Sequence, residues 1–152
     1  MMYMKIKVGD SLIIVYLIDT FFEDCEKKEL ILQIKDVFIR LIEYYNFDLK
    51  GRFECFLYEN IKYGSILEIK QCDELLFPRD LIDIKVKVYK NAKFYFKTKE
   101  YFVLNKYNNI YYDGEYYYIL LDNIDNIINI IEFGDIIYKE KDICLSKMKF
   151  IQ

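Results

Sequence analysis

The chain has 152 residues, 54% of them hydrophobic, with only 5 Gly and 1 Pro. These values exclude a disordered chain and predict one compact domain with enough apolar surface for a core. The net charge of −3 argues against a molecule attracted as a whole to polyanions, and the absence of histidine excludes Ser-His and Cys-His nucleophile chemistry within the chain.

The N-terminal segment predicts a β-hairpin. Residues 4–8 and 12–18 are rich in β-branched and apolar side chains, and Gly9-Asp10 between them is typical of a turn. No apolar run approaches 18 residues, which excludes a membrane-spanning helix, and no small-residue cleavage site follows residue 18. We therefore expect a cytoplasmic protein without membrane contact.

Residues 25–45 are the only long segment with helical periodicity. The spacing predicts an amphipathic helix that begins after Asp24 as its cap and ends near Asn46. The positions expected to be buried are Leu30, Ile34, Val37, Leu41 and Tyr45, widened by Ile31, Phe38 and Ile42. Leu32 and Ile39 would form a small outward apolar stripe. Because the rest of the chain offers one other short helix, the partner of this helix must be a sheet.

A second hairpin is predicted over 51–72. Residues 51–58 and 65–72 alternate between apolar and polar side chains, with a loop at 59–64. The segment 73–80 then breaks the pattern and contains Pro78, the only proline. It is the best candidate for a subdomain junction between 1–72 and 81–152 within a single domain.

The clearest alternation follows at 82–97, which predicts a hairpin with its turn at Lys90-Asn91. The segment 83–99 carries six lysines and one aspartate. The candidate binding residues on its outer face are Lys85, Lys87, Lys93, Tyr95 and Lys97. Lysines interleaved with tyrosines could contact a nucleic-acid backbone and stack bases. Lysines also protect an exposed sheet edge from aggregation, and the absence of arginine favours that interpretation.

Two predictions concern residues 110–121. Asp113-Gly114 is a strong hairpin signal because both residue types tolerate positive φ. The segment 115–121 is apolar on both faces. It is therefore either a central strand covered on both sides, which we favour, or one of its tyrosine rows, with Tyr116 and Tyr118, forms a recognition face.

The C-terminal part predicts a short helix over 123–133. Ile124, Ile127, Ile128 and Ile131 recur at helical spacing, and Gly134 stands where a left-handed residue would end the helix. Residues 107–142 hold eight acidic side chains and two lysines. With the basic segment before it, this composition predicts an electrically lopsided molecule suited to a charged protein partner or to self-association.

No motif for a cofactor or a metal is present. The four cysteines have no CxxC spacing and are expected to be reduced thiols; they are Cys25, Cys55, Cys72 and Cys144. Zinc would need all four across 119 residues, and no glycine loop could cradle a phosphate. We therefore expect a protein without a metal, a cofactor or a catalytic motif.

Several stretches resemble the MecA-type adaptors that deliver substrates to the unfoldase of the Clp protease. They are MKIK at 4–7, ELILQIKDV at 29–37, FDLKG at 47–51, KYGSILEI at 62–69, YYDGEYYYILLD at 111–122 and EFGDII at 132–137. The chain departs from that family in lacking an acidic linker and in the hairpin at 83–97. The resemblance implies a non-enzymatic adaptor that binds two proteins.

The sequence predicts an α+β protein in which a strand-rich antiparallel sheet is covered by one long helix, about 25–45, with a second short helix, about 123–133. The predicted role is a non-enzymatic protein-interaction or regulatory domain. The alternatives are a nucleic-acid-binding module that uses the lysine–tyrosine hairpin and an unrecognised carboxylate-dependent enzyme.

Overall fold

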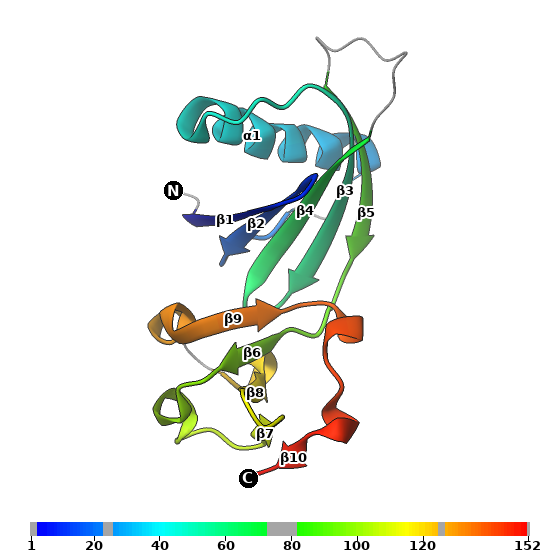
Figure 1. The fold of residues 1–152 in the computed structure, drawn as a ribbon. Helices are drawn as coiled ribbons and strands as arrows, with labels where there is room; N and C mark the ends of the chain where they lie inside the picture. Colours follow the sequence, from blue (N-terminus) through cyan, green and yellow to red (C-terminus); the bar gives the residue numbers. More distant parts are fainter. Residues whose placement is uncertain (1–2, 23–25, 73–81, 125–126, 152) are drawn as a thin grey trace. The chain divides into compact units, whose positions relative to one another are not determined.

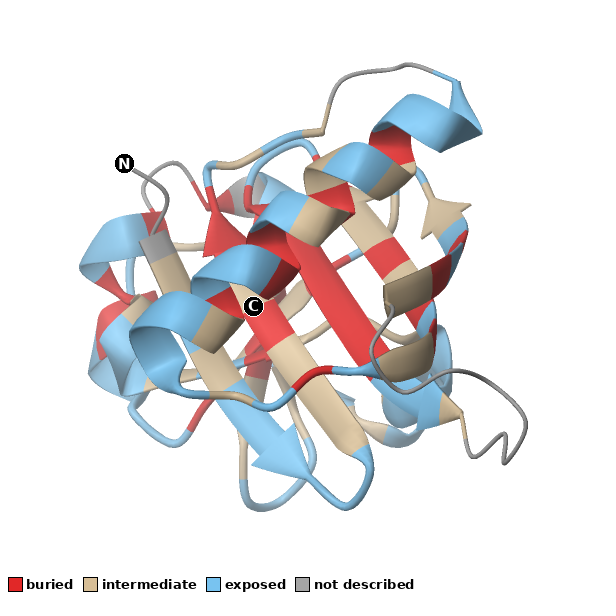
Figure 2. Ribbon diagram, turned by 90° about the horizontal axis from the view of Figure 1, so that it is seen from above, coloured by how far each residue is buried: buried red, intermediate tan, exposed pale blue. Residues whose placement is uncertain are grey.

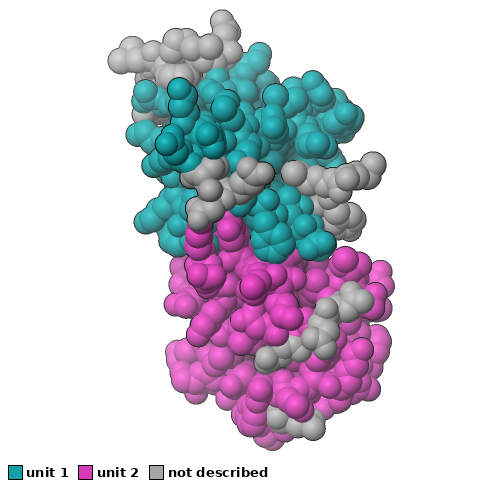
Figure 3. Space-filling model, turned by 180° about the vertical axis from the view of Figure 1, so that it is seen from behind, with its two compact units in different colours: residues 1–57, 65–89 teal, residues 58–64, 90–152 magenta. Residues whose placement is uncertain are grey.

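The computed structural model describes residues 3–22, 26–72, 82–124 and 127–151. They form an α+β fold with one long helix, which confirms the predicted class (Figure 1). The described strands divide between two five-stranded sheets, not one sheet. The chain forms two compact units: the first unit is 1–57 with 65–89, and the second unit is 58–64 with 90–152 (Figure 3). The junction predicted at 73–80 lies outside the described residues.

The first sheet has the order β1-β2-β4-β3-β5. Its elements are β1 (Tyr3–Gly9), β2 (Leu12–Ile18), α1 (Lys27–Tyr45), β3 (Gly51–Asn60), β4 (Gly64–Cys72) and β5 (Ile82–Tyr89). The predicted N-terminal hairpin is confirmed: β1 and β2 are antiparallel, and Gly9 lies opposite Leu12. Asp10 and Ser11 form the turn, with Ser11 in the left-handed region at φ 56°.

The prediction of a hairpin over 82–97 is wrong, because β5 and β6 (Tyr95–Thr98) belong to different sheets. β5 pairs with β3 in the first sheet, and Figure 1 shows the two strands running in the same direction, so this sheet is mixed. The chain does turn at Lys90-Asn91, but it then enters the second unit. The apolar side chains of β5 pack into the core of the first unit, where Ile84 and Val86 are buried with Phe53. Long-range pairing therefore replaces the local hairpin.

Helix α1 covers one face of the first sheet. Its buried residues are Leu30, Ile34, Val37, Phe38 and Leu41, and Figure 2 shows buried positions on one side of the helix and exposed positions on the other. Tyr45, predicted to be buried, is 47% exposed because it lies in the last turn, beyond the core contacts. The helix begins at Lys27 after Glu26, and Asn46 ends it with φ 60°. The predicted cap Asp24 lies outside the described residues.

The second sheet has the order β10-β7-β8-β6-β9. Its strands are β6 (Tyr95–Thr98), β7 (Tyr111–Tyr112), β8 (Tyr117–Leu120), β9 (Gly134–Ile137) and β10 (Lys149–Phe150). Short 3₁₀ turns connect them: η1 (Tyr101–Leu104), η2 (Leu121–Asn123), η3 (Ile127–Asn129), η4 (Ile131–Phe133), η5 (Glu140–Asp142) and η6 (Leu145–Lys147). Strand β8 is central, which confirms that part of the favoured prediction, but the face with Tyr116 and Leu120 is only half-buried, so the strand is not fully covered on both sides. The Asp113-Gly114 hairpin joins it to β7.

In the described residues of the short helix predicted at 123–133, the chain forms 3₁₀ turns. The buried residues of this segment are Ile124, Ile127 and Ile130, whereas Ile128 is 61% exposed. A 3₁₀ turn has three residues per turn, so positions three apart share a face. The α-helical spacing predicted from the sequence grouped Ile128 with Ile124 and Ile127, whereas the structure buries Ile130 with them instead.

Gly134 does not end a helix. Its φ of −172° and ψ of −163° are extended, and it is the first residue of β9. A Cβ at this position would overlap the carbonyl oxygen of Lys97 and press on the ring of Phe96. The glycine is required because β9 passes very close to β6.

Candidate functional site

The structure divides the seven candidate residues between the two units. Lys85 and Lys87 lie on β5 in the first unit. The other five belong to the second unit, on or next to β6 and β8: Lys93, Tyr95, Lys97, Tyr116 and Tyr118. The candidate residues therefore belong to two units and not to one hairpin. Lys93 is exposed just before β6, and the remaining four share one sheet face.

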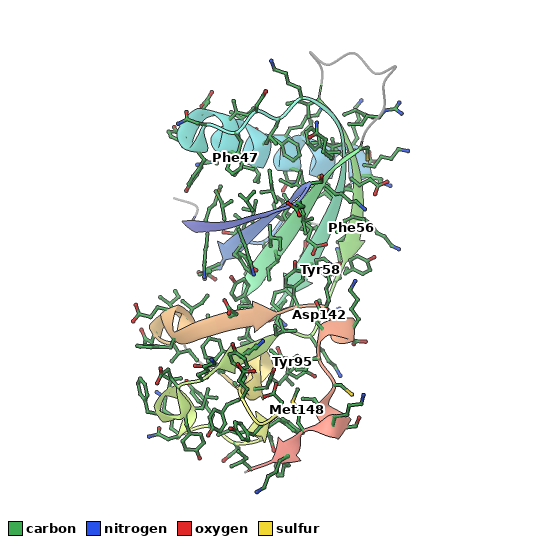
Figure 4. The ribbon with its side chains drawn as sticks, in the orientation of Figure 1. Phe47, Phe56, Tyr58, Tyr95, Asp142 and Met148 are labelled. Atoms are coloured by element: carbon green, nitrogen blue, oxygen red, sulfur yellow. The ribbon has the colours of Figure 1, made fainter. Side chains whose placement is uncertain are left out.

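One face of the second sheet is rich in tyrosine. Strand pairing places Lys97 opposite Tyr118 and Tyr95 opposite Leu120. Tyr118 in turn lies opposite Tyr111, and Tyr111 opposite Phe150. We call this surface the tyrosine face; it comprises Tyr95, Lys97, Tyr111, Tyr116, Tyr118, Leu120 and Phe150. Tyr95 is labelled on β6 in Figure 4.

The opposite face of the same sheet forms the core of the second unit. Phe96 and Ile119 are fully buried there, and Ile136 is 6% exposed. By contrast, Phe150 on the tyrosine face is 54% exposed, and most of the other residues of that face are half-buried. Tyr118, at 6% exposed, is the buried centre of the tyrosine face. Strand β8 is thus closely covered on one side and partly open on the other.

The lysines beside this face are engaged by its own side chains. The Nζ of Lys97 lies 4.1 Å from the ring centroid of Tyr116 and 6.0 Å from that of Tyr118. Lys99 lies 5.0 Å from the Tyr116 ring centroid, and its Nζ is 3.4 Å from Oε1 of Glu115. Both ammonium groups make cation–π contacts, which are modest at exposed sites and stronger where the ring is desolvated.

Asp113 orders the β7–β8 turn. Its Oδ1 accepts hydrogen bonds from the backbone N–H groups of Glu115 (2.8 Å) and Tyr116 (2.7 Å). Its Oδ2 accepts a hydrogen bond from the hydroxyl of Tyr118 at 2.6 Å. These bonds, with the backbone N–H of Tyr116 first and the Tyr118 hydroxyl second, hold the pKa of Asp113 below its usual value. Burial, followed by the hydrogen bond to Asp113, raises the pKa of Tyr118.

Tyr95 also keeps its hydroxyl proton well above neutral pH. Burial is the main cause that raises its pKa, followed by the charge of Glu140. Strand β9 pairs with β6 and places the exposed Asp135 opposite Lys97. The tyrosine face is therefore mainly aromatic, with the charge of Lys97 beside Tyr118 and the charge of Asp135 on the edge strand β9.

Three members of the tyrosine face were not candidate residues from the sequence. Leu120 lies two residues after Tyr118 on the same strand, so alternation places it on the same face. Tyr111 could have been found, because the Asp113-Gly114 hairpin places it opposite Tyr118 once the register is known. Phe150 could not have been found, since it lies on the two-residue strand β10, whose pairing with β7 has no signal in the local sequence. Tyr112 and Tyr117 belong to the other face, where their rings stack at 4.6 Å.

The described residues contain no group of three or more His, Cys, Asp and Glu that could hold a metal ion. The Cys55 thiol is buried, and burial raises its pKa to about 12, so it is unreactive near neutral pH. Cys25, the cysteine nearest the helix start, lies outside the described residues.

None of the helices that the structure describes combines the length and the apolar character needed to cross a membrane.

Comparison with models of known protein families gave no match, and comparisons with curated proteins and with solved structures gave none either. The resemblance to MecA-type adaptors therefore remains a prediction from the sequence.

Proposed function

We propose that the protein is a non-enzymatic interaction domain and that the tyrosine face is its contact surface for another protein. The observation that carries this proposal is the grouping of Tyr95, Tyr111 and Phe150 around the ordered ring of Tyr118, on a face that the sheet leaves partly open. Tyrosine provides a large contact area and a hydroxyl while losing little conformational entropy, which is why it is enriched at interfaces.

The distribution of charge favours a protein partner over a nucleic acid. Lys85 and Lys87 do not belong to the unit that carries this face. The second unit contains ten acidic and ten basic residues, so it has no excess of positive charge. Lys97 and Lys99 already contact Tyr116. Nucleic-acid affinity depends on free cations that neutralise phosphates, and this face presents few of them.

The chemistry of the face defines the expected partner. Tyr111, Leu120 and Phe150 offer partly exposed apolar surface, and Asp135 and Lys97 offer one charge of each sign on the same face. We propose a folded protein surface with apolar side chains at its centre and a polar rim, which is the usual anatomy of a specific interface.

Site-specific photocrosslinking tests this proposal. A benzoylphenylalanine in place of Tyr111 should give discrete crosslinked protein products in cells, and Phe150→Asp in the same chain should abolish them without changing the melting temperature. The same group in place of Ile128, which is 61% exposed on η3, is the matched control. Identical products from both positions, or recovery of nucleic acid instead of protein, would contradict the proposal.

A direct binding measurement separates the two ligand classes. Single-stranded RNA should bind weakly to the intact protein at physiological salt, and Tyr95→Ala should change that binding little. A stacked base is worth about 1–3 kcal/mol, so submicromolar binding that requires Tyr95 would support the nucleic-acid alternative.

A further inference from the structure

Strand β5 forms an edge of the first sheet. It has eight residues and pairs with β3 on one side, and no described strand pairs with its other side. Ile84 and Val86 are buried beneath α1, whereas Lys85 and Lys87 are exposed on the face away from the helix. The backbone N–H and C=O groups along such an edge can form a ladder with an added strand.

A shallow groove lies between the paired strands β3 and β5 of the first unit, on the side of β5 opposite its free edge. It has a volume of about 220 Å³ and is lined by Glu54, Cys55, Phe56, Lys85, Val86 and Lys87. Phe56, labelled on β3 in Figure 4, is half-buried and contributes an apolar surface. Lys85 and Lys87 form the side of the groove next to the free edge.

The lysines of β5 are available to a negatively charged ligand. Arg52 and Asp83 on the same face form an ion pair at 3.3 Å. Among the described residues, neither Lys85 nor Lys87 forms an ion pair, and the ammonium group of Lys87 lies 5.3 Å from the ring centroid of Tyr89. Glu54 is the one carboxylate that lines the groove. Two lysines against one glutamate leave the groove with a positive charge.

We propose that β5 binds an extended acidic segment of another protein by strand addition. In a strand, alternate side chains point to opposite faces. A segment with acidic residues at every second position would place carboxylates beside Lys85 and Lys87. Its intervening apolar side chains would cover Ile82 and Val88, which are only partly buried at the edge of the core. This surface is separate from the tyrosine face.

A second copy of the chain does not meet these requirements. Pairing β5 with β5 would bring the Lys85 and Lys87 row of one copy beside the same row of the other, and like charges on neighbouring strands destabilise the pairing. The charge of the edge selects an acidic partner.

A designed peptide tests the charge requirement. The probe is a fluorescein-labelled nine-residue peptide of alternating threonine and glutamate, and the comparison peptide carries lysine in place of glutamate. Fluorescence anisotropy with the full chain should show the glutamate peptide binding at least tenfold more tightly. The double variant Lys85→Glu with Lys87→Glu should reverse this preference. The matched control, Lys5→Glu with Lys7→Glu on the other edge strand, β1, should keep it.

A second measurement tests the ladder itself. Proline at alternate threonines removes backbone donors and should weaken the glutamate peptide at least tenfold, and binding should slow amide exchange within 82–89 of the protein. Equal binding of the proline peptide would overturn strand addition, and the absence of binding by either peptide would show that the lysines only protect the edge. The lysine variants leave Tyr111 and Phe150 unchanged. A failure of strand addition at β5 is therefore distinguishable from a failure of the tyrosine face in the photocrosslinking experiment.

Discussion

Both units build a five-stranded sheet, but the strands have 7–10 residues in the first unit and 2–4 in the second, and the two sheets are covered differently. The first unit places a 19-residue helix on its sheet, and the core is largely aliphatic. The second unit has no α-helix in its described residues and covers its sheet with 3₁₀ turns and aromatic contacts such as Tyr63–Phe94, with ring centroids 5.5 Å apart. A continuous amphipathic helix buries one broad stripe of apolar side chains. Short turns instead leave backbone N–H and C=O groups that need hydrogen-bond partners from outside the turn.

The second unit supplies these partners from buried polar side chains. Asn60 is 3% exposed; its Nδ2 donates a hydrogen bond to the carbonyl oxygen of Ala92 at 2.7 Å, and its Oδ1 accepts from the backbone N–H of Lys62 and Tyr63. The Oγ1 of Thr98 donates to the carbonyl oxygen of Phe133 at 2.6 Å. We therefore expect the first unit to be most sensitive to cavities and the second to lost hydrogen bonds and close contacts.

The largest expected effect is a cavity under α1. Leu41→Ala should lower the free energy of unfolding by about 2–5 kcal/mol, because Leu41 is fully buried. Hydrogen exchange resolved along the chain should show the loss in 30–72. Glu43→Ala, on the exposed face of the same helix, is the control and should be nearly silent. Equal losses from the two variants would refute the assignment of the helix faces.

A comparably large effect is expected from Gly134→Ala in the second unit. The new methyl group would overlap the backbone of Lys97, and a backbone shift of this kind costs about 1–3 kcal/mol or more. Thermal unfolding and exchange within 94–98 should both report it. Gly9→Ala is the control, since its nearest contact is 3.9 Å away. If the two variants melt alike, the close approach of β9 to β6 is wrong.

A smaller effect is expected at Asn60. Asn60→Ala leaves the carbonyl oxygen of Ala92 and two backbone N–H groups without these partners, which should cost about 1–3 kcal/mol. Denaturant unfolding measures the change, with Asn105→Ala, at an exposed position of the second unit with φ −62°, as a comparison. A loss at Asn60 no greater than at Asn105 would show that side-chain hydrogen bonds do not distinguish the second unit.

The smallest effect is the pH dependence of the β7–β8 turn. The pKa of Asp113 in the folded state is lowered from 3.8, so its contribution to stability is complete above that value and is lost as the pH falls through the folded-state pKa. The melting-temperature difference between the wild type and Tyr118→Phe should therefore be constant near neutral pH and shrink as the pH falls below 3.8. A carbon-detected titration of Asp113 would contradict this if it gave an ordinary pKa.

Local patterns in the sequence were sufficient for the fold class and for several elements. Turn residues and alternation predicted the 4–18 hairpin and the β7–β8 hairpin, and helical spacing predicted the buried face of α1. These features depend on interactions between residues close in sequence, so the amino-acid order alone determines them. The tyrosine-rich strand was also placed centrally, because both of its faces are apolar.

The tertiary structure decided which distant strands pair. Strand β5 joins β3, and β6 lies between β8 and β9, although 82–97 has the local pattern of one hairpin. The same long-range packing selected 3₁₀ turns over an α-helix near Ile128, made Gly134 a close-contact residue and brought Phe150 beside Tyr111. Alternation states which side chains share a face of a strand, but it does not identify the neighbouring strand. That choice depends on which pairing buries the most apolar surface across the whole chain.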